Sequence, residues 1–577
     1  MSGYRMAGAV ATALALALSA CTTPRAGPAS GAIQVNQVGF AAGAAKWAAV
    51  PQGASDRFTV VDARSGREVH RGTLGPATHW APANQVVRLA DFSRLSTPGE
   101  YRLHVDGLPD SHRFAIAPDA YAALNAAAIK AYYYNRAGIA LEPRHAGPWA
   151  RAAGHPDTAV RVHASAAGPG RPEGTLISSP KGWYDAGDYN KYIVNSGITV
   201  YTLLAAYEHF PQFFQRQVLN IPESGNGLPD LLNEVLWNLD WMLTMQDPAD
   251  GGVYHKLTNL GFDGGVMPHQ AVGERYVVQK TTAATLDFAA VMAAGSRVFR
   301  AFEAQRPGLS QRMLAAARRA WQWAQAHPDQ VYRQPPDIHT GEYGDAELDD
   351  EFAWAAAELY VATGDDAYYA AMRADRTPMG VPAWGDVKGL AWISLAQHRD
   401  KLTRAADRQL IERRITGLSE QLAAGWQASA YRVAMQSGDL IWGSNSVALN
   451  QALVLVQGYR LTGERRLLDA AQSALDYVLG RNPLGLSMVT GIGTVSPMRP
   501  HHRPSEADGI AAPVPGFIVG GPNPGQQDAK GCPPYPSALP ALSYLDHECS
   551  YASNEVAINW NAPLVYLSAA LQALTPK

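Results

Sequence analysis

LPDLLNEVLWNLDWMLTMQD, residues 228–247, repeats apolar side chains every three or four positions. This is the spacing of one face of an α-helix, and the proline and aspartate at its start favour a helix beginning there. Segments with the same period occur before and after it: AYAALNAAAIKAYYYNR (120–136), TTAATLDFAAVMAAGSRVF (281–299), DDEFAWAAAELYVATG (349–364), SVALNQALVLVQGYRLTG (446–463) and RLLDAAQSALDYVLG (466–480). The pattern predicts a large domain built from helices.

The number of helical segments predicts two concentric rings of helices. We count about twelve helical segments between residues 119 and 573, separated by irregular loops and without a short repeat. Twelve helices in one domain favour an (α/α)6 barrel, in which six inner and six outer helices surround a central depression. A long irregular α-solenoid is the alternative. The longest loops, 480–505 and 516–525, are rich in Gly and Pro, and loops of this kind often carry function.

The residues before the helical region read as β-structure. Short stretches that alternate apolar and polar residues are separated by turn residues, as in IQVNQVGF (33–40), RFTVVDA (57–63), NQVVRLADFS (84–93) and GEYRLHV (99–105). Short strands at this spacing predict a small all-β sandwich. We therefore expect a sandwich over 33–117 and the helical domain over 118–577.

The N-terminus predicts export. Residues 1–20 contain a basic residue, an apolar run and small residues, which is typical of a signal peptide and too short for a membrane span. LSAC (18–21) resembles a bacterial lipobox, which implies lipidation of Cys21, a flexible tether over 21–32 and anchoring to a membrane, here expected to be the outer membrane. An ordinary signal peptide with a chance cysteine is the alternative.

Composition limits the class of function. The 577-residue chain has a formal net charge of −3, so it has neither the basic surplus that nucleic acid attracts nor an acidic tail. Its 14 Trp and 25 Tyr are core residues or sugar-stacking residues. We find no serine nucleophile elbow, phosphate-binding loop or dinucleotide fingerprint. The two late cysteines, Cys532 and Cys549, either pair in an oxidising compartment or remain free thiols.

Three carboxylates are the strongest chemical signal. GWYDAGDYNKY (182–192) places Asp185 and Asp188 three residues apart, and Glu555 follows late in the chain. Hydrolysis of a glycosidic bond needs one protonated and one ionised carboxyl group. Calcium binding by these aspartates or by DAELDDE (345–351) is the rival interpretation.

Histidines offer two further interpretations. A zinc site would draw on His145, His155 and His163, but no cysteine and no tight spacing accompany them, so we expect no zinc. The dense group His501, His502 and Arg503 is either a surface basic patch or a set of hydrogen-bond donors for sugar hydroxyls.

Taken together, the motifs resemble glycoside hydrolase family nine, the inverting cellulase family, in the subgroup with an N-terminal immunoglobulin-like domain. The resemblance runs in order along residues 33–573. Its motifs are IQVNQVGF and DFSRLSTPGEYRLHV (91–105), then GWYDAGDYNKYIVNSG (182–197), WGSN (442–445), DYVLGRNPLGLSMVTGIG (476–493), RPHHR (499–503) and YLDHECSYASNEVAINWNAP (544–563). Each motif alone is moderately specific, and their order makes the resemblance strong.

The resemblance implies roles for individual residues. Asp188 becomes the general base that activates water, Asp185 its neighbour on the same water, and Glu555 the general acid. The residues implied to bind or line the substrate cleft are His501, Arg503, Asp546, Tyr551 and Trp442. Asp349, Asp350 and Asp386 resemble a stabilising calcium site. No cofactor is implied for catalysis, and the family's Cys/His zinc site keeps only His155 here.

The resemblance implies an inverting endo-β-1,4-glucanase acting on cellulose-like β-glucans. An exo-acting β-glucosidase or glucosaminidase is the first alternative, and segment 144–175 is the stretch that would close one end of the cleft. A lipid-anchored protein that binds glycans without cleaving them is the second. For inversion, the carboxyls of Asp188 and Glu555 are expected about 6.5 to 9.5 Å apart, with room for a water between.

Overall fold

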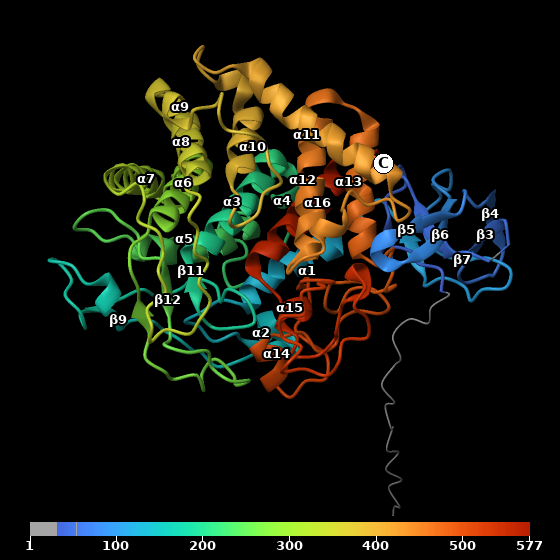
Figure 1. The fold of residues 1–577 in the computed structure, drawn as a ribbon, viewed down its shortest axis with the longest axis horizontal. Helices are drawn as coiled ribbons and strands as arrows, with labels where there is room; N and C mark the ends of the chain where they lie inside the picture. Colours follow the sequence, from blue (N-terminus) through green and yellow to red (C-terminus); the bar gives the residue numbers. More distant parts are fainter. Residues whose placement is uncertain (1–31, 54, 577) are drawn as a thin grey trace, which may run out of the picture.

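The computed structural model describes residues 32–53 and 55–576. A small β-domain lies beside a large helical domain, as Figure 1 shows, and its colours follow the chain from blue to red at the C-terminal end. The predicted signal peptide, the tether over 21–31 and Cys21 lie outside the described residues. None of the described helices is long and apolar enough to cross a membrane.

The β-domain consists of two sheets packed face to face. One sheet has the strand order β1-β8-β7-β3-β4 and the other β2-β6-β5. Apolar residues alternate inward along the strands, and the rings of Phe40, Phe92 and Phe114 meet between them. The strand bounds are β1 (Gly39–Phe40), β2 (Trp47–Pro51), β3 (Arg57–Asp62), β4 (Glu68–Thr73), β5 (Thr78–Trp80), β6 (Gln85–Asp91), β7 (Gly99–His104) and β8 (Phe114–Ile116).

Two sets of helices build the larger domain. The inner helices are α3 (Ile193–His209), α6 (Thr282–Phe299), α8 (Asp349–Thr363), α10 (Lys388–His398), α12 (Ser444–Thr462) and α16 (Ile558–Leu574). The outer helices are α1 (Ala122–Tyr134), α5 (Asp230–Thr244), α7 (Leu309–Ala326), α9 (Asp366–Met372), α11 (Arg408–Ala428) and α13 (Arg465–Val478).

The inner helices close into a ring. Each contacts the next in chain order, and α16 returns to contact α3. The outer helices pack behind them, for example α7 on α6 and α13 on α12. Inner helices such as α3 are buried over nearly their whole length, whereas α7 buries one face and exposes the other, as expected for an amphipathic outer helix. The predicted (α/α)6 barrel after a β-sandwich is confirmed, and the solenoid alternative is wrong because the ring closes.

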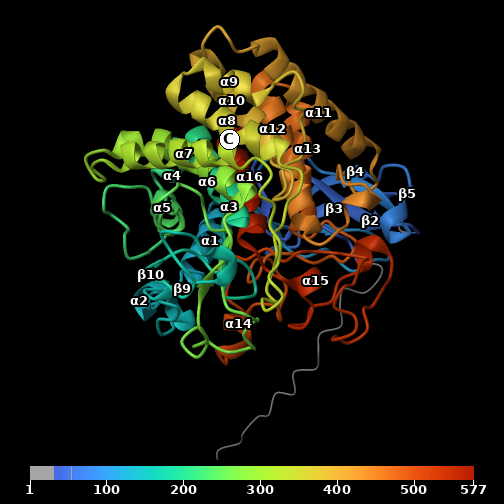
Figure 2. The same cartoon turned by 60° about the vertical axis from the view of Figure 1, so that its left-hand side comes forward.

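Long loops gather at one end of the barrel. Figure 2 shows the segments around α14 (Arg503–Ala507) and α15 (Tyr551–Asn554) at the same end as β9 (Val160–Val162) and β10 (Leu176–Ile177). A second five-stranded sheet in this region has the order β10-β9-β13-β12-β11, with β11 (Lys191–Tyr192), β12 (Lys256–Thr258) and β13 (Tyr276–Val277). The sheet fixes β11, which leads directly into α3.

The two domains are joined by aromatic and polar contacts. Trp80 of the sandwich packs on Tyr431 with ring centroids 4.9 Å apart. The Tyr431 hydroxyl donates to Gln34 and Gln85 at 2.9 and 2.6 Å. Buried contacts of this kind hold the sandwich against the outside of the barrel near α11 and α13.

Candidate active site

The early and late acidic motifs meet at the loop end of the barrel. Asp185 and Asp188 lie on the loop before β11, and Glu555 lies between α15 and α16. The Ile558 N–H donates to the Asp185 carbonyl at 2.9 Å, and the Gly187 N–H donates to Oε1 of Glu555 at 3.3 Å. The backbone of one motif is therefore bonded to the other.

Asp188 is held through one of its two carboxylate oxygens. Oδ2 accepts hydrogen bonds from Asn190 Nδ2 at 2.5 Å and from the Tyr192 hydroxyl at 3.2 Å. Both donors lie within four residues of Asp188, on the turn into β11 and on the strand itself. The hydrogen bonds that the described residues make to this carboxylate all go to Oδ2, which leaves Oδ1 for an external partner.

Asp185 is buried and has a different set of partners. Asn195 Nδ2 donates to Oδ1 at 2.6 Å, and the Tyr343 hydroxyl donates to Oδ2 at 2.7 Å. Burial, together with the charge of Asp188, raises the pKa of Asp185 to about 8. Two neighbouring carboxylates rarely ionise together at neutral pH, because each charge disfavours the other.

Glu555 has a strongly perturbed carboxyl group. Burial, and then the charge of Asp188, raises the pKa of Glu555 well above its usual range, although the Gly187 N–H opposes this shift. The pKa shifts of Glu555 and Asp185 share one electrostatic cause, which is the negative charge of Asp188. An ionised carboxylate beside a protonated one is the combination that glycosidic hydrolysis requires.

An aromatic pair, the exposed Trp442 and the half-buried Tyr551, lies near the acidic residues in the late part of the chain. Trp442 has 41% of its surface exposed, and its ring lies 5.3 Å from that of Tyr551. The ring of His501 is 6.2 Å from Tyr551. Aromatic faces open to solvent suit stacking on the apolar face of a sugar.

Arg503 and Asp546 are engaged within the protein. The Arg503 guanidinium donates to the carbonyls of Gly187 and Asp263 at 2.6 and 2.8 Å, so it braces the loop that carries Asp188. The Asp546 carboxylate accepts the Met498 and Arg499 N–H groups, each at 2.9 Å. These contacts shape the wall of the site.

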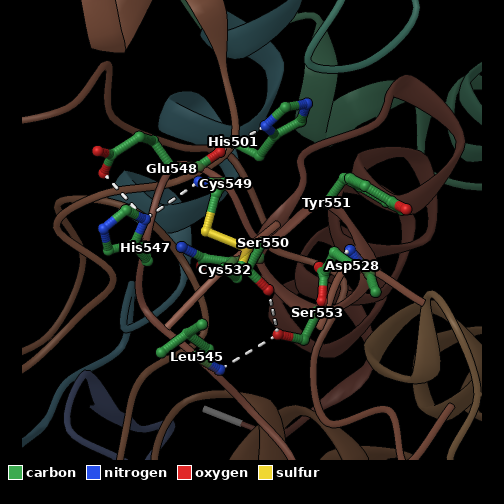
Figure 3. Close-up of a disulfide and its surroundings, with 12 residues drawn as sticks. His501, Asp528, Cys532, Leu545, His547, Glu548, Cys549, Ser550, Tyr551 and Ser553 are labelled. Carbon is green, nitrogen blue, oxygen red and sulfur yellow. Dashed lines mark hydrogen bonds and ion pairs between the residues drawn. A yellow bond between two sulfur atoms is a disulfide. The ribbon is translucent and has the colours of Figure 1, made fainter. Parts of the chain in front are cut away.

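A disulfide ties down the segment beside His501. Cys532 and Cys549 are bonded across a separation of 17 residues, and Figure 3 shows the bridge next to Glu548 and Tyr551. His501 Nδ1 lies 2.5 Å from the Glu548 carbonyl. The bridge therefore restrains the segment around Cys549. This segment carries the Glu548 carbonyl that contacts His501, and Tyr551 follows two residues later.

Several site residues were missed by sequence reasoning. Asn190 and Tyr192 stand inside the quoted motif GWYDAGDYNKY, and Asn195 follows one helical turn later, so their proximity to the aspartates was readable. Tyr343 has no such signal, because it reaches Asp185 across 158 residues. Its backbone has a positive φ of 46°, which is uncommon for a residue other than glycine.

The calcium prediction has a different outcome for each residue. Among the described residues, no three or more His, Cys, Asp or Glu side chains converge as a metal site, so Asp349, Asp350 and Asp386 do not form one ligand set. Asp349 is exposed, Asp350 accepts the Val387 N–H at 2.7 Å, and Asp386 is paired with Lys388.

Beside these residues lies a buried acidic cluster. Both carboxylate oxygens of Asp287 and of Glu351 are buried without a hydrogen-bond partner in the described structure. Burial, together with the charge of Asp350, raises the pKa of Asp287, and burial, together with Asp287, raises the pKa of Glu351. Oxygen-rich, unneutralised carboxylates of this kind fit a hard cation such as Ca²⁺.

The three histidines considered for zinc have separate partners. His155 Nδ1 lies 2.9 Å from the Tyr184 hydroxyl, His163 is bonded to Ser165, and His145 is bonded to Asn220. Each therefore has a structural role of its own.

Comparison with known protein families identifies the family to which the chain belongs. Residues 121–568 match the model of glycosyl hydrolase family 9, and residues 29–110 match that of the cellulase N-terminal ig-like domain. The chain belongs to glycosyl hydrolase family 9. It is therefore a glycoside hydrolase, with the immunoglobulin-like domain that the sequence predicts.

Individual relatives span nearly the whole chain. It is 46% identical over 569 residues to a xyloglucan-specific endo-β-1,4-glucanase of Bacteroides ovatus, covering 96% of each protein. It is 33% identical over 616 residues to a cellulose 1,4-β-cellobiosidase of Acetivibrio thermocellus, covering 94% of this chain and 67% of that one. The structure of a Bacteroides ovatus family 9 protein superposes with a TM-score of 0.89 and 44% identity, covering 94% of this chain and 99% of that chain.

Proposed function

We propose that this family 9 enzyme is an inverting endo-β-1,4-glucanase in which Asp188 is the general base and Glu555 the general acid. Asp188 takes a proton from a water molecule whose oxygen attacks the anomeric carbon. Glu555 gives its proton to the leaving glycosidic oxygen as that bond breaks. The observation that carries this proposal is the geometry that joins the two acidic motifs, in which the Gly187 N–H, between the two aspartates, donates to Oε1 of Glu555 at 3.3 Å.

Asp185 completes this arrangement as the partner of the base. Its raised pKa keeps the carboxyl group protonated near neutral pH, so it can hydrogen-bond the same water without adding a second charge. Tyr343 and Asn195 fix its two oxygens. The raised pKa values of Asp185 and Glu555 favour the protonated form of both groups, and acid–base catalysis needs such a proton donor on Glu555.

For the substrate, we propose a β-1,4-glucan of the xyloglucan type. The support is the 46% identity to the xyloglucan-specific enzyme and the exposed Trp442 packed on Tyr551, which we assign to stacking on a glucosyl ring. His501 lies beside this pair and is assigned to hydrogen bonding of sugar hydroxyls. Arg503 and Asp546 support the cleft through the contacts described above.

Exo-action is the second candidate. It is favoured by the similarity to a cellobiosidase and by segment 144–175, which meets the late loop where Trp149 Nε1 donates to the Ala512 carbonyl at 3.3 Å. A segment anchored in this way is the candidate for blocking one end of the cleft.

Viscosity and reducing ends, followed together, separate these candidates. The soluble protein, residues 22–577 with Cys21 omitted, would be incubated with xyloglucan and with carboxymethylcellulose. Endo-action lowers viscosity early with few new ends, whereas exo-action releases ends at nearly constant viscosity. Binding without turnover would indicate the non-catalytic alternative. Asp188→Asn and Glu555→Gln are the controls that should abolish hydrolysis.

Two further proposals concern export and metal binding. We propose that Cys21 is lipidated after removal of residues 1–20, which would hold the enzyme at the outer membrane; the disulfide is consistent with an oxidising compartment. We also propose that the buried carboxylates of Asp287 and Glu351, whose oxygens have no hydrogen-bond partner in the described structure, draw a stabilising Ca²⁺, with the charge of Asp350 beside them. Neither feature takes part in the catalytic step.

A further inference from the structure

Lys256 is a buried lysine directly behind the base. It lies on β12 opposite Tyr192 of β11, and the residue has no exposed surface. Its Nζ donates to Gln334 Oε1, Thr340 Oγ1 and the Gly341 carbonyl at 3.1, 3.0 and 2.6 Å. These acceptors are all neutral. Burying an ammonium group without a directly paired anion costs free energy. We therefore expect Lys256 to have a function at this position.

Two hydrogen-bond chains lead from this ammonium to the same oxygen of Asp188. In the first, Lys256 holds Gly341, and the Gly341 N–H donates at 3.1 Å to the Tyr192 hydroxyl, which donates to Oδ2. This hydrogen-bond chain is short, and the centroid of the Tyr192 ring lies 5.6 Å from Nζ of Lys256.

The second chain runs through hydroxyl groups. Thr340, which accepts from Lys256, lies 2.6 Å from the Thr258 hydroxyl. Thr258 donates to Asn190 Oδ1 at 3.1 Å, and Asn190 Nδ2 donates to Oδ2 of Asp188. Either hydroxyl of the Thr340–Thr258 pair can donate, and Thr258 also donates to the Asn259 carbonyl at 2.8 Å. In the first chain every donor is directed toward Asp188, which is the direction that favours the carboxylate anion.

The charges around Lys256 agree with this arrangement. Burial lowers the pKa of Lys256 to about 7, and the negative charges of Asp188 and then Glu342 oppose that shift. Asp185 and Glu555, the other carboxyl groups of the site, are each coupled electrostatically to Asp188. The other titratable or cationic groups near Lys256 and Asp188 are Asp263, His255, His501, Tyr192, Tyr332 and Arg503.

We propose that Lys256 is a positioning residue for the base: its ammonium anchors both chains that fix Oδ2 of Asp188, and its positive charge stabilises the carboxylate that activates water. With Oδ2 held from behind, Oδ1 faces the water. The proposal rests on the function proposed above, and it adds a group on a different strand, outside the motifs that carry the acidic residues.

The pH–rate profile of Lys256→Met tests the charge. Loss of a nearby positive charge makes the carboxylate easier to protonate, so the acid limb of kcat/KM on xyloglucan should move to higher pH by about one unit. Lys256→Arg keeps the charge and should keep the limb near its wild-type position. Lys130→Met is the control, because Lys130 is a partly buried lysine that also donates to a backbone carbonyl, that of Leu219 at 2.9 Å, but lies on α1. An unmoved acid limb in Lys256→Met would overturn the proposal.

A thermal double-mutant cycle keeps the test independent of activity. Lys256→Met should lower Tm more in the wild-type background than in Asp188→Asn, because the second background has already lost the attracting charge. Equal losses in both backgrounds would overturn the proposal even if Lys256→Met were too unstable for kinetics. If the wild-type protein cleaved no β-glucan, the proposed function would fail, while this cycle would still report on the Lys256–Asp188 interaction.

Discussion

The backbone N–H of Gly187 donates to Oε1 of Glu555 at 3.3 Å, across 368 residues of sequence. Gly187 stands between the two aspartates, so this bond sets the distance between the early and late acidic motifs. A side chain at this position would collide with the His501 carbonyl, because a Cβ built there lies 2.5 Å from it. The glycine is therefore required for the two walls of the site to approach.

The separate roles of Asp188 and Glu555 can be distinguished by the leaving group. Glu555→Gln should lose about 10²- to 10⁴-fold in kcat on xyloglucan, because the leaving alkoxide then lacks its proton. On a dinitrophenyl β-cellobioside, whose leaving group needs no proton, the loss should be far smaller. Asp188→Asn should lose activity on both substrates. Equal losses for Glu555→Gln on the two substrates would argue against its role as the acid.

Tyr343 should matter through its hydroxyl alone. Tyr343→Phe removes the donor to Asp185 Oδ2 while keeping the ring that packs on Tyr192 and Trp384. We expect kcat to fall about tenfold, the effect of losing one hydrogen bond to a buried carboxyl group. Steady-state kinetics on xyloglucan measures it. Tyr276→Phe, which loses a hydroxyl bonded to Glu274, is the control; an equal kcat in both variants would contradict the prediction.

Stability at acidic pH should depend on Glu208 at the end of α3. Burial alone would raise the pKa of Glu208, but Arg297 and His398 overcome it and lower the pKa to about 2. The folded-state pKa is thus below the ordinary value of 4.5, so the stabilisation is complete above pH 4.5 and is lost as pH falls toward 2. It amounts to about 3 kcal/mol.

Urea unfolding between pH 6 and pH 3 checks this dependence. The stability advantage of the wild type over Glu208→Gln should shrink as the pH falls. Glu420→Gln removes an exposed carboxylate paired with Arg466 and should show little pH-dependent difference. An advantage that stays constant from pH 6 to pH 3 would rule out the assigned pKa.

Calcium should stabilise the protein without being needed for the chemistry. Adding Ca²⁺ to chelator-treated enzyme should raise Tm by several degrees, because it neutralises the buried carboxylates of Asp287 and Glu351. Asp287→Asn and Asp350→Asn should each reduce that rise, whereas Asp375→Asn, which is 80% exposed on its side chain, should keep it. A Tm that does not respond to Ca²⁺ would exclude the proposed cation.

Much of the architecture could be predicted because it follows from local periodicity. Apolar residues with a helical period mark the barrel helices, and alternation marks the sandwich strands. The helical segment LPDLLNEVLWNLDWMLTMQD, for instance, contains α5. The acidic motifs were also readable, since Asp185 and Asp188 share a short stretch with the residues that orient them.

The remaining features depend on contacts distant in sequence. Tyr343 donates directly to Asp185 from a distant loop. Lys256, on β12, is linked to Asp188 only through intervening hydrogen bonds. Neither residue has a distinctive neighbour in sequence. Arg503 is predicted either to lie in a surface basic patch or to donate to sugar hydroxyls, whereas in the structure its guanidinium donates to the Gly187 carbonyl. For calcium, Asp386 is paired with Lys388 and Asp349 is exposed, whereas Asp350 is coupled electrostatically to Asp287 on α6, which is distant in sequence.

The central claim is that Asp188 activates water for direct attack while Glu555 donates the proton. The most direct measurement is proton NMR of the anomers formed in the first minutes of hydrolysis of a soluble β-1,4-gluco-oligosaccharide. A single displacement by water predicts that the new reducing end appears first as the α-anomer and then equilibrates. Initial release of the β-anomer would show that a carboxylate attacks carbon in a double displacement, and would contradict this account.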